Sequence, residues 1–206
     1  MGLEQKLDQW HFRRALENGE FFPYFQPLVV LATGELHGFE VLARWEHPNL
    51  GMIAPDIFIP LAESNGLIGE VSSQVLEKAF KAFSLHGKGL RLAFNISPLQ
   101  LKDLTLPRKI RRIAEDAGLP LECATVEITE SAMAEDMATA RIISADFKAM
   151  GCGIALDDFG TGYSSLYHLK SLPFDELKVD RTFVSSMTTE RESRKIVAAV
   201  VGLGQS

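Results

Sequence analysis

Two adjacent carboxylates, Asp157 and Asp158, are the residues whose types and spacing point most directly to chemistry. They follow the apolar run 154–156 and precede the glycine-containing stretch 159–162. Adjacent aspartates repel each other, so solvent or a cation must offset their charge. A packed strand has no structural reason to end in this way, whereas a site for metal ions and a charged substrate does. We therefore treat this segment as the centre of a candidate metal site.

Three more oxygen-bearing side chains, which also fall in or beside apolar strand-like runs, extend the candidate metal site. They are Glu40, Asn95 and Glu127. Carboxylate and amide oxygens are hard ligands that suit Mg²⁺ or Mn²⁺. Two such ions about 4 Å apart favour in-line displacement at phosphorus, because they activate water and stabilise the leaving oxygen. The five histidines lack the paired helical spacing of a zinc site.

Lys178, which lies near the end of the strand-like run 174–179 and is followed by Asp180, has two interpretations. It could be a buried cation that balances the carboxylates and orients water. It could instead be a nucleophile that forms a Schiff base, which requires a desolvated lysine. Several carboxylates nearby should keep the lysine charged, which favours the first role. Spacing alone supports a metal-assisted hydrolase or lyase.

Hydrophobic periodicity predicts the elements that position these side chains. The runs 21–31 and 36–45 flank the turn Thr33–Gly34 and predict an antiparallel hairpin. A helix is expected before the hairpin, at 3–18, with Leu7, Trp10 and Ala15 as apolar contacts. Further helices are predicted at 71–83, 107–117, 136–150, 163–169 and 190–203, and further strands at 90–96, 124–128, 153–156 and 174–179.

Alternation of strands and helices predicts an α/β fold with a parallel sheet. Polar residues at the ends of successive strands favour a (β/α) barrel, in which the active site lies at the carboxyl ends of the strands. The sequence has no G-x-G-x-x-G turn and no phosphate-binding lysine loop, so the nucleotide-binding open sheets are disfavoured.

Length and composition predict one domain at 21–206, preceded by a helical segment at 1–20 that could end a linker. The chain has 206 residues, of which 46% are hydrophobic, and this suits a single core. A net charge of −6 without a basic face disfavours binding to duplex nucleic acid. Cys123 and Cys152 are expected to be reduced core residues of a cytoplasmic protein. No apolar run reaches the length of about 18 residues that a membrane span needs, so this domain should make no membrane contact, although a parent protein could be anchored.

Six segments resemble, in order, the motifs of one known family. They are Phe25–Pro27, Glu40–Trp45, Asn95–Ser97, Val126–Glu130, Asp157–Gly162 and Leu177–Asp180. Together they are similar to the EAL-domain cyclic-di-GMP phosphodiesterases, whose naming motif is represented by Glu40–Trp45 with Val41 in its middle position. The resemblance runs from about Phe21 to the end of the sequence.

The resemblance implies a modified TIM (β/α)₈ barrel with one antiparallel strand, whose last strands and a further metal-centre glutamate would follow Ser206. It implies hydrolysis of cyclic di-GMP to linear pGpG with two Mg²⁺ or Mn²⁺ ions. The implied metal ligands are Glu40, Asn95, Glu127, Asp157 and Asp158. The implied substrate contacts are Gln26, Leu42, Arg44 and Asp180. Lys178 would contact the water or phosphate, and Glu130 would brace the loop after Asp158; these two complete a catalytic set with Glu40, Asp157 and Asp158.

The family also implies a homodimer and a parent protein with sensory domains. Two other functions remain open from the sequence. One is a catalytically inactive receptor that binds cyclic di-GMP, although such receptors usually lose metal ligands and none is lost within residues 1–206. The other, suggested without the resemblance, is an unrelated barrel lyase that uses Lys178 as a covalent nucleophile.

Overall fold

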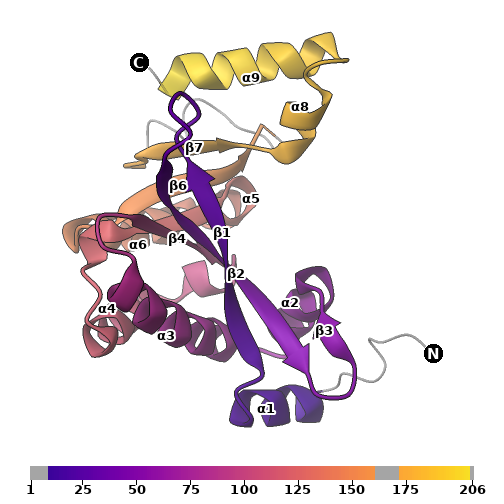
Figure 1. Ribbon diagram of the computed structural model, residues 1–206, viewed down its shortest axis with the longest axis vertical. Helices are drawn as coiled ribbons and strands as arrows, with labels where there is room; N and C mark the ends of the chain where they lie inside the picture. Colours follow the sequence, from indigo (N-terminus) through magenta and orange to yellow (C-terminus); the bar gives the residue numbers. More distant parts are fainter. Residues whose placement is uncertain (1–8, 161–171, 205–206) are drawn as a thin grey trace. The chain divides into compact units, whose positions relative to one another are not determined.

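The computed structural model describes residues 9–160 and 172–204 (Figure 1). The chain divides into two compact units, one of Met1–Phe94 and Arg108–Ala124, the other of Asn95–Pro107 and Thr125–Ser206. The helix predicted at 163–169 lies outside the described residues, as does Leu7 of the predicted N-terminal helix. The division into a segment at 1–20 and a domain at 21–206 stays a prediction.

A long hairpin is the centre of the first unit and confirms the predicted antiparallel pair. Strand β1 (Phe21–Val29) pairs with β2 (Leu36–His47), which also pairs antiparallel with the short strand β3 (Gly51–Ile53). In addition, β2 pairs in parallel with β4 (Arg91–Ile96). The pairing is therefore mixed within this unit, and the two long strands of the hairpin are seen at the middle of Figure 1.

On the side that faces away from β2, the amino end of β1 is hydrogen-bonded to a helix. The Phe21 N–H donates to Oε1 of Gln74 at 3.1 Å, so this group faces away from β2. Two prolines, Pro23 and Pro27, follow in the same strand. Proline has no N–H to donate, and within sheets it is confined to edges, strand starts and bulges. The edge of β1 that faces away from β2 is therefore poor in hydrogen-bond donors.

Aromatic packing joins the helix α1 (Gln9–Glu17) to the hairpin. Phe12 of α1 lies with its ring centroid 4.7 Å from that of Trp45, and Trp45 lies 5.1 Å from Phe21. All three side chains are fully buried. Ala15 is buried as expected, but Trp10 is 59% exposed, so its predicted core contact is wrong. Phe12 takes that place because it lies on the face of α1 that meets the hairpin.

The remaining helices of the first unit are α2 (Pro55–Ser64), α3 (Ile68–His86) and most of α4 (Leu106–Ala117). The helix α3 buries the predicted apolar stripe, which consists of Val75, Leu76, Ala79, Phe80 and Phe83. Neither β3 nor α2 was predicted from the sequence. Neither Cys123 nor Cys152 forms a disulfide. Cys152 is buried as expected, but Cys123 is only partly buried, so its prediction as a core residue is wrong.

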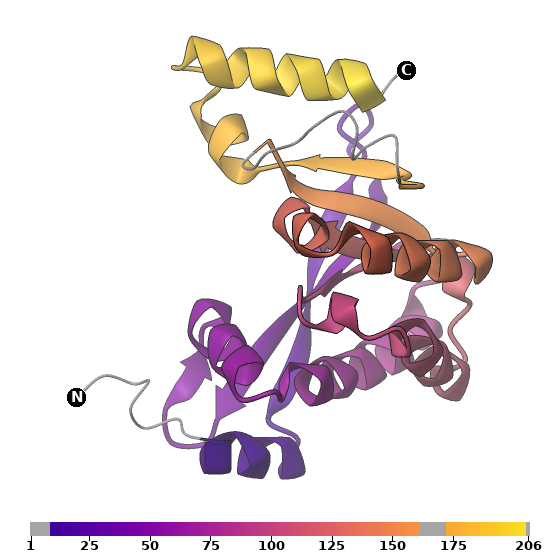
Figure 2. The ribbon, with the colours of Figure 1, turned by 180° about the vertical axis from the view of Figure 1, so that it is seen from behind.

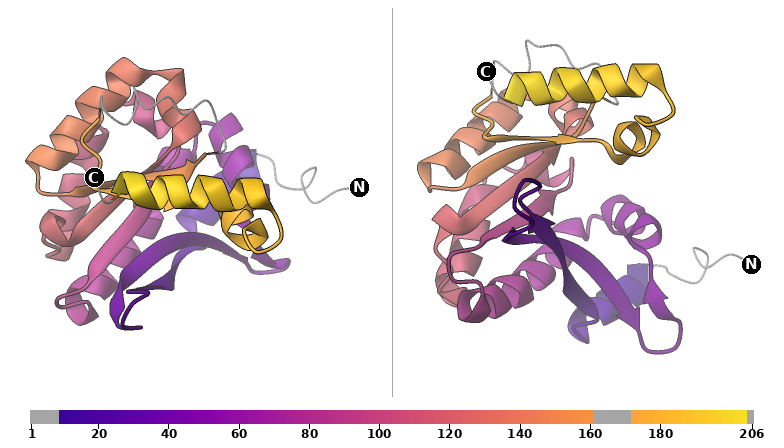
Figure 3. Two further views of the ribbon diagram at one scale, coloured as in Figure 1. Left: turned by 90° about the horizontal axis from the view of Figure 1, so that it is seen from above. Right: turned by 45° about the horizontal axis from the view of Figure 1, so that its top comes forward.

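Three parallel strands form the centre of the second unit. They are β5 (Ala124–Thr129), β6 (Gly153–Phe159) and β7 (Glu176–Val179). Helices α5 (Glu130–Glu135) and α6 (Met137–Ala149) connect β5 to β6, and α8 (Arg181–Ser186) and α9 (Arg191–Gly204) follow β7 (Figures 2 and 3). The predicted strands at 124–128, 153–156 and 174–179 are therefore present with shifted ends.

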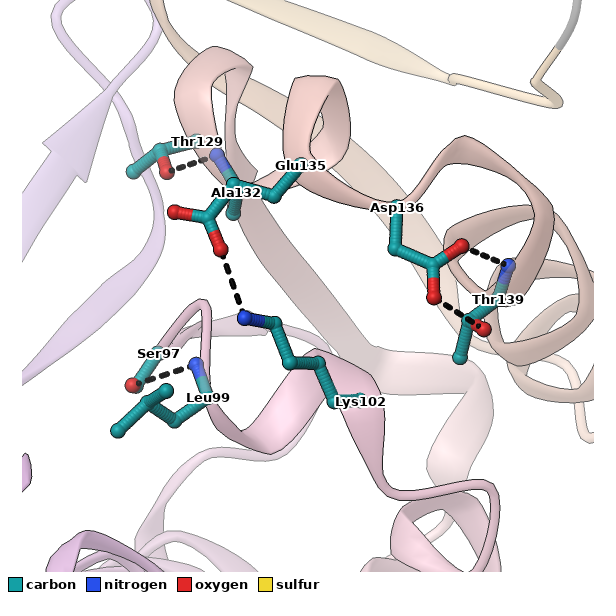
Figure 4. Close-up of polar contacts among 8 residues, drawn as sticks. All are labelled: Ser97, Leu99, Lys102, Thr129, Ala132, Glu135, Asp136 and Thr139. Atoms are coloured by element: carbon teal, nitrogen blue, oxygen red, sulfur yellow. Dashed lines mark hydrogen bonds and ion pairs between the residues drawn. The ribbon is translucent and has the colours of Figure 1, made fainter.

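Side-chain caps explain why α5 and α6 are separate helices (Figure 4). Thr129 Oγ1 accepts a hydrogen bond from the N–H of Ala132, and Asp136 Oδ1 accepts one from the N–H of Thr139. Such caps satisfy N–H groups that have no partner within their own helix. A 2.8 Å ion pair between Glu135 and Lys102 ties the end of α5 to the 3₁₀ turn Gln100–Lys102.

Among the described residues, no helix combines the length and apolar character that a membrane span requires.

Candidate metal centre

Lys178 brings together two carboxylates from neighbouring strands of the second unit. Its Nζ lies 2.7 Å from Oε2 of Glu127 on β5 and 3.0 Å from Oδ2 of Asp157 on β6. Glu127 is 2% exposed, so its charge has little access to water. A buried carboxylate needs such a partner, because an unpaired buried charge is strongly destabilising. These contacts fit the interpretation of Lys178 as a balancing cation.

A bulge in β6 places both aspartates opposite this one lysine. Leu156 pairs with Leu177, and the next pair is Phe159 with Val179, so Asp157 and Asp158 together oppose Lys178. A bulge alters the direction of side chains, and bulges are common beside active sites. In a regular strand, by contrast, adjacent side chains point to opposite faces. The bulge therefore changes the alternation at the two residues that the sequence marked.

Asp158 has the left-handed backbone conformation, with a φ of +56°. It is the only non-glycine residue with positive φ in the described part of the chain. Aspartate reaches this region more easily than most residues, because its short side chain can hydrogen-bond locally. The Asp158 N–H donates to Oδ1 of Asp157 at 2.9 Å. Strain of this kind is concentrated at functional sites, where the surrounding structure maintains it.

The electrostatic environment of Asp158 disfavours its charged form. Burial raises the pKa of the Asp158 carboxyl, and the neighbouring charges of Asp157 and Asp180 raise it further. The Asp158 and Asp180 side chains share a hydrogen bond, and hydrogen bonds from Thr182 lower the pKa of Asp180. The pKa of Asp158 is thus shifted upward and that of Asp180 downward. A cation would relieve the same repulsion by favouring the carboxylate.

Glu130 contacts the segment that follows the two aspartates. It begins α5, is 4% exposed, and accepts a hydrogen bond through Oε2 from the N–H of Gly160 at 3.2 Å. Gly160 has a φ of +101°, which favours glycine at that position. The contact links β5, through α5, to the end of β6. The role expected for Glu130, bracing the loop after Asp158, concerns residues that are mostly outside the described range.

Three of the four substrate residues implied by the resemblance, Gln26, Leu42 and Arg44, share one face of the hairpin in the first unit, whereas Asp180 follows β7 in the second unit. Glu40, Leu42 and Arg44 alternate along β2, so their side chains point to the same face. Gln26 of β1 lies directly opposite Glu40 and shares that face. The Arg44 guanidinium lies over the ring of Tyr24, 5.5 Å from its centroid. Asn95, the remaining proposed ligand, is an exposed residue of β4.

The chemistry of the donors fits a hard divalent cation. The acidic residues Glu40, Glu127 and Asp157 could bind a metal ion, since each offers carboxylate oxygen. Glu127 is buried, and the pKa of Asp158 is raised, so the charged form of each carboxylate is disfavoured by its surroundings. A bound cation would stabilise both charged forms. The residues present are therefore suited to Mg²⁺ or Mn²⁺ rather than to a soft, sulfur-bound metal.

Comparison with known proteins decides the family. The family model of the EAL domain matches residues 10–206 of this chain. The chain belongs to the EAL domain family. The cyclic di-GMP phosphodiesterase RocR of Pseudomonas aeruginosa is 39% identical over 196 residues, which cover 94% of this chain and 50% of RocR. An uncharacterized signaling protein of Caulobacter vibrioides is 43% identical over 194 residues, or 94% of this chain and 24% of that protein. The chain thus spans from about a quarter to half of the length of these relatives.

Solved structures support the same assignment. The chain matches the structure of the PaMucR phosphodiesterase in complex with c-di-GMP with a TM-score of 0.89 and 38% identity. The match covers 94% of this chain and 80% of that chain. The EAL domain described here therefore has the TIM-like α/β fold, with mixed strand pairing and the antiparallel pair β1–β2. Its closure as an eight-stranded barrel stays a prediction.

Sequence reasoning missed Asp175, which contacts both β6 and α6 within the second unit. Its Oδ2 accepts a hydrogen bond from the N–H of Ile154, and its Oδ1 pairs with Lys148. The available signal was the polar residue placed just before the short strand at 176–179. A single aspartate in such a turn is common, so its residue type alone does not favour a contact with β6.

Proposed function

We propose that this EAL domain hydrolyses cyclic di-GMP to linear pGpG with two Mg²⁺ or Mn²⁺ ions. The observation that carries the proposal is the convergence of Glu127 and Asp157 on Lys178, next to the strained Asp158. This acidic arrangement occurs in a chain that is 39% identical to the phosphodiesterase RocR. An acidic protein can hold an anionic substrate when divalent ions supply the positive charge.

In this proposal the metal ligands are Glu40, Asn95, Glu127, Asp157 and Asp158. When bound, the ions would polarise the phosphate and make water more acidic. Lys178 neutralises charge at Glu127 and Asp157 and orients the attacking water or a phosphate oxygen. One water is consumed and one P–O bond breaks, so the cyclic dinucleotide opens to a linear product.

The other side chains position the substrate and the site. Gln26, Leu42 and Arg44 would bind the dinucleotide from the shared face of the hairpin. Asp180 would also contact the substrate, and its side chain hydrogen-bonds the carboxyl of Asp158. Glu130 holds the Gly160 backbone, and with it the end of the segment that carries the two aspartates.

We further propose that the domain works as a homodimer in the cytoplasm, within a larger protein that includes sensory domains. The curated relatives described above are themselves larger proteins, of which this chain matches a part. Light scattering of the full-length protein, with and without substrate, tests the dimer. A monomer under both conditions would contradict it.

The test of the function is a direct assay with purified full-length protein. Cyclic di-GMP and Mn²⁺ or Mg²⁺ are supplied, and pGpG is measured by chromatography. The wild-type protein should form pGpG, and Asp157→Asn should form at least a hundredfold less. Glu192→Gln is the matched control, because Glu192 is an exposed residue of α9 that pairs with the exposed Lys195 at 2.8 Å. Tight binding without turnover in either metal would favour the inactive receptor and overturn the proposal.

A further inference from the structure

We propose that Asp175 is a positioning residue that fixes the register of β7 on β6 and thereby places Lys178 between Asp157 and Glu127. The inference rests on the proposed function for its catalytic consequence. The residues that carry the inference, from Glu127 to Lys178, all lie in the second unit. No motif of the resemblance described above includes Asp175.

Asp175 fastens the start of β7 to β6 through two hydrogen bonds. Its Oδ2 accepts from the N–H of Ile154 at 2.8 Å, and its own N–H donates to the Ile154 carbonyl oxygen at 2.9 Å. One residue therefore engages both backbone groups of Ile154. These bonds lie immediately before the first regular pair of the two strands, Ala155 with Glu176.

The ladder that Asp175 extends is short. β7 has four residues, and only two regular pairs, Ala155–Glu176 and Leu156–Leu177, precede the bulge opposite Lys178. A slip of one residue would turn every side chain of a strand to the opposite face. Lys178 would then point away from Asp157. Because β7 is short and its pairing is interrupted at one end, its register has to be set at the other end. The hydrogen bonds of Asp175 set it there.

The ion pair of Asp175 contributes less to positioning than its hydrogen bonds do. Lys148 Nζ lies 2.6 Å from Oδ1, but the two side chains are 35% and 39% exposed. Ion pairs with such access to water are worth little because solvent screens them. The hydrogen bonds to Ile154 are formed with strand backbone and define its register directly. The acceptor oxygen, rather than the negative charge, is therefore the feature that matters.

This distinction gives two variants with opposite expectations. Asp175→Asn keeps an acceptor oxygen at the same distance from the backbone but removes the charge. Asp175→Glu keeps the charge, and can still pair with Lys148, but moves the carboxylate by one methylene. Register control predicts that the Asn variant is close to wild type and that the Glu variant is impaired. A role through the ion pair predicts the reverse order.

The experiment uses full-length protein with both Asp175 variants, Lys148→Met, and Glu192→Gln as a surface control. Steady-state assays with cyclic di-GMP and Mn²⁺ give kcat and KM, and hydrogen exchange gives the protection of the β7 amides. We expect Asp175→Glu to lower kcat at least tenfold with KM changed less than threefold, and to speed exchange at Lys178 and Val179 at least tenfold. Asp175→Asn and Lys148→Met should remain within threefold of wild type in all three quantities.

Hydrogen exchange separates this inference from the proposed function, because it requires no turnover. If wild type proves inactive, the phosphodiesterase proposal fails, and the exchange pattern of the two variants still decides the role of Asp175. Wild-type exchange and kcat in Asp175→Glu would overturn the inference. So would an Asn variant and a Lys148 variant that are both impaired, since that result assigns the effect to the ion pair.

Discussion

The ammonium nitrogen of Lys178 lies 2.7 Å from Oε2 of Glu127, whose side chain is 2% exposed. A carboxylate so removed from water depends on nearby positive charge, because its desolvation is otherwise uncompensated. The lysine therefore supports the folded site before any divalent ion is added. A bound cation would share this task, and metal binding would then stabilise the second unit.

Replacement of Lys178 by Met should destabilise the protein most strongly in the absence of metal. Removal of one member of a buried ion pair costs about 3 kcal/mol, because the other charge remains buried. Mn²⁺ should restore more of the unfolding free energy in the variant than it adds to wild type. Urea unfolding in chelator and in Mn²⁺ measures both values. An equal loss in the two conditions would contradict a shared role for lysine and metal.

Replacement of Asp157 by Asn should reduce kcat at least a hundredfold while weakening substrate binding less than tenfold. The carboxylate contacts Lys178 and is a proposed ligand, so its loss should affect charge stabilisation in the transition state more than recognition of the dinucleotide. Turnover gives kcat, and calorimetry with Ca²⁺ in place of Mn²⁺ gives binding. Equal losses in the two measurements would argue against this division of roles.

Replacement of Glu130 by Ala should loosen the end of β6. The variant loses the hydrogen bond that Glu130 accepts from the Gly160 N–H. A typical net contribution of one hydrogen bond is about 1 kcal/mol, which corresponds to a several-fold increase in amide exchange at Gly160. Exchange measured by mass spectrometry or NMR tests this, with Ser131→Ala as the neighbouring control. Unchanged exchange at Gly160 would show that the contact does not restrain the backbone.

The cap of α6 gives a prediction for pH. Hydrogen bonds from the N–H and hydroxyl of Thr139 lower the pKa of Asp136 in the folded protein. A group with a lowered folded-state pKa stabilises the fold above its unfolded pKa of about 3.9, and this stabilisation is lost as the pH falls through the folded value. The difference in unfolding free energy between wild type and Asp136→Ala should therefore shrink between about pH 5 and pH 2. A constant difference over that range would contradict the assigned cause.

Periodicity and turn residues were sufficient to predict the hairpin, the buried stripe of α3 and the three parallel strands of the second unit. The signals are local, because alternating or helical apolar patterns report which face each segment buries. The segment at 51–64 was missed. Its strand β3 has only three residues, and its helix α2 contains Pro60 and carries no side-chain cap at its start. Short and proline-containing elements depend on tertiary packing, which local patterns do not show.

The residues of the candidate site could be predicted from the sequence, but the backbone conformation that positions them could not. The adjacent aspartates stood out in the sequence, and so did Lys178 at the end of a strand. The bulge opposite Lys178 and the positive φ of Asp158 were not predictable, since nothing in the order of residues distinguishes them from regular strand. Trp10 illustrates the same limit, because only the packing of Phe12 against Trp45 determines which aromatic side chain of α1 is buried.

The prolines of β1 have a consequence for behaviour at high concentration. Because the Phe21 N–H faces Gln74, strand alternation places positions 23, 25 and 27 on that same outer side. Proline at two of these three positions leaves Phe25 as the only one of them able to donate to an approaching chain. Exposed strand edges with a full row of donors invite uncontrolled self-association, and proline is one of the means by which proteins prevent it. The outer edge of β1 is thus poorly suited to direct such self-association.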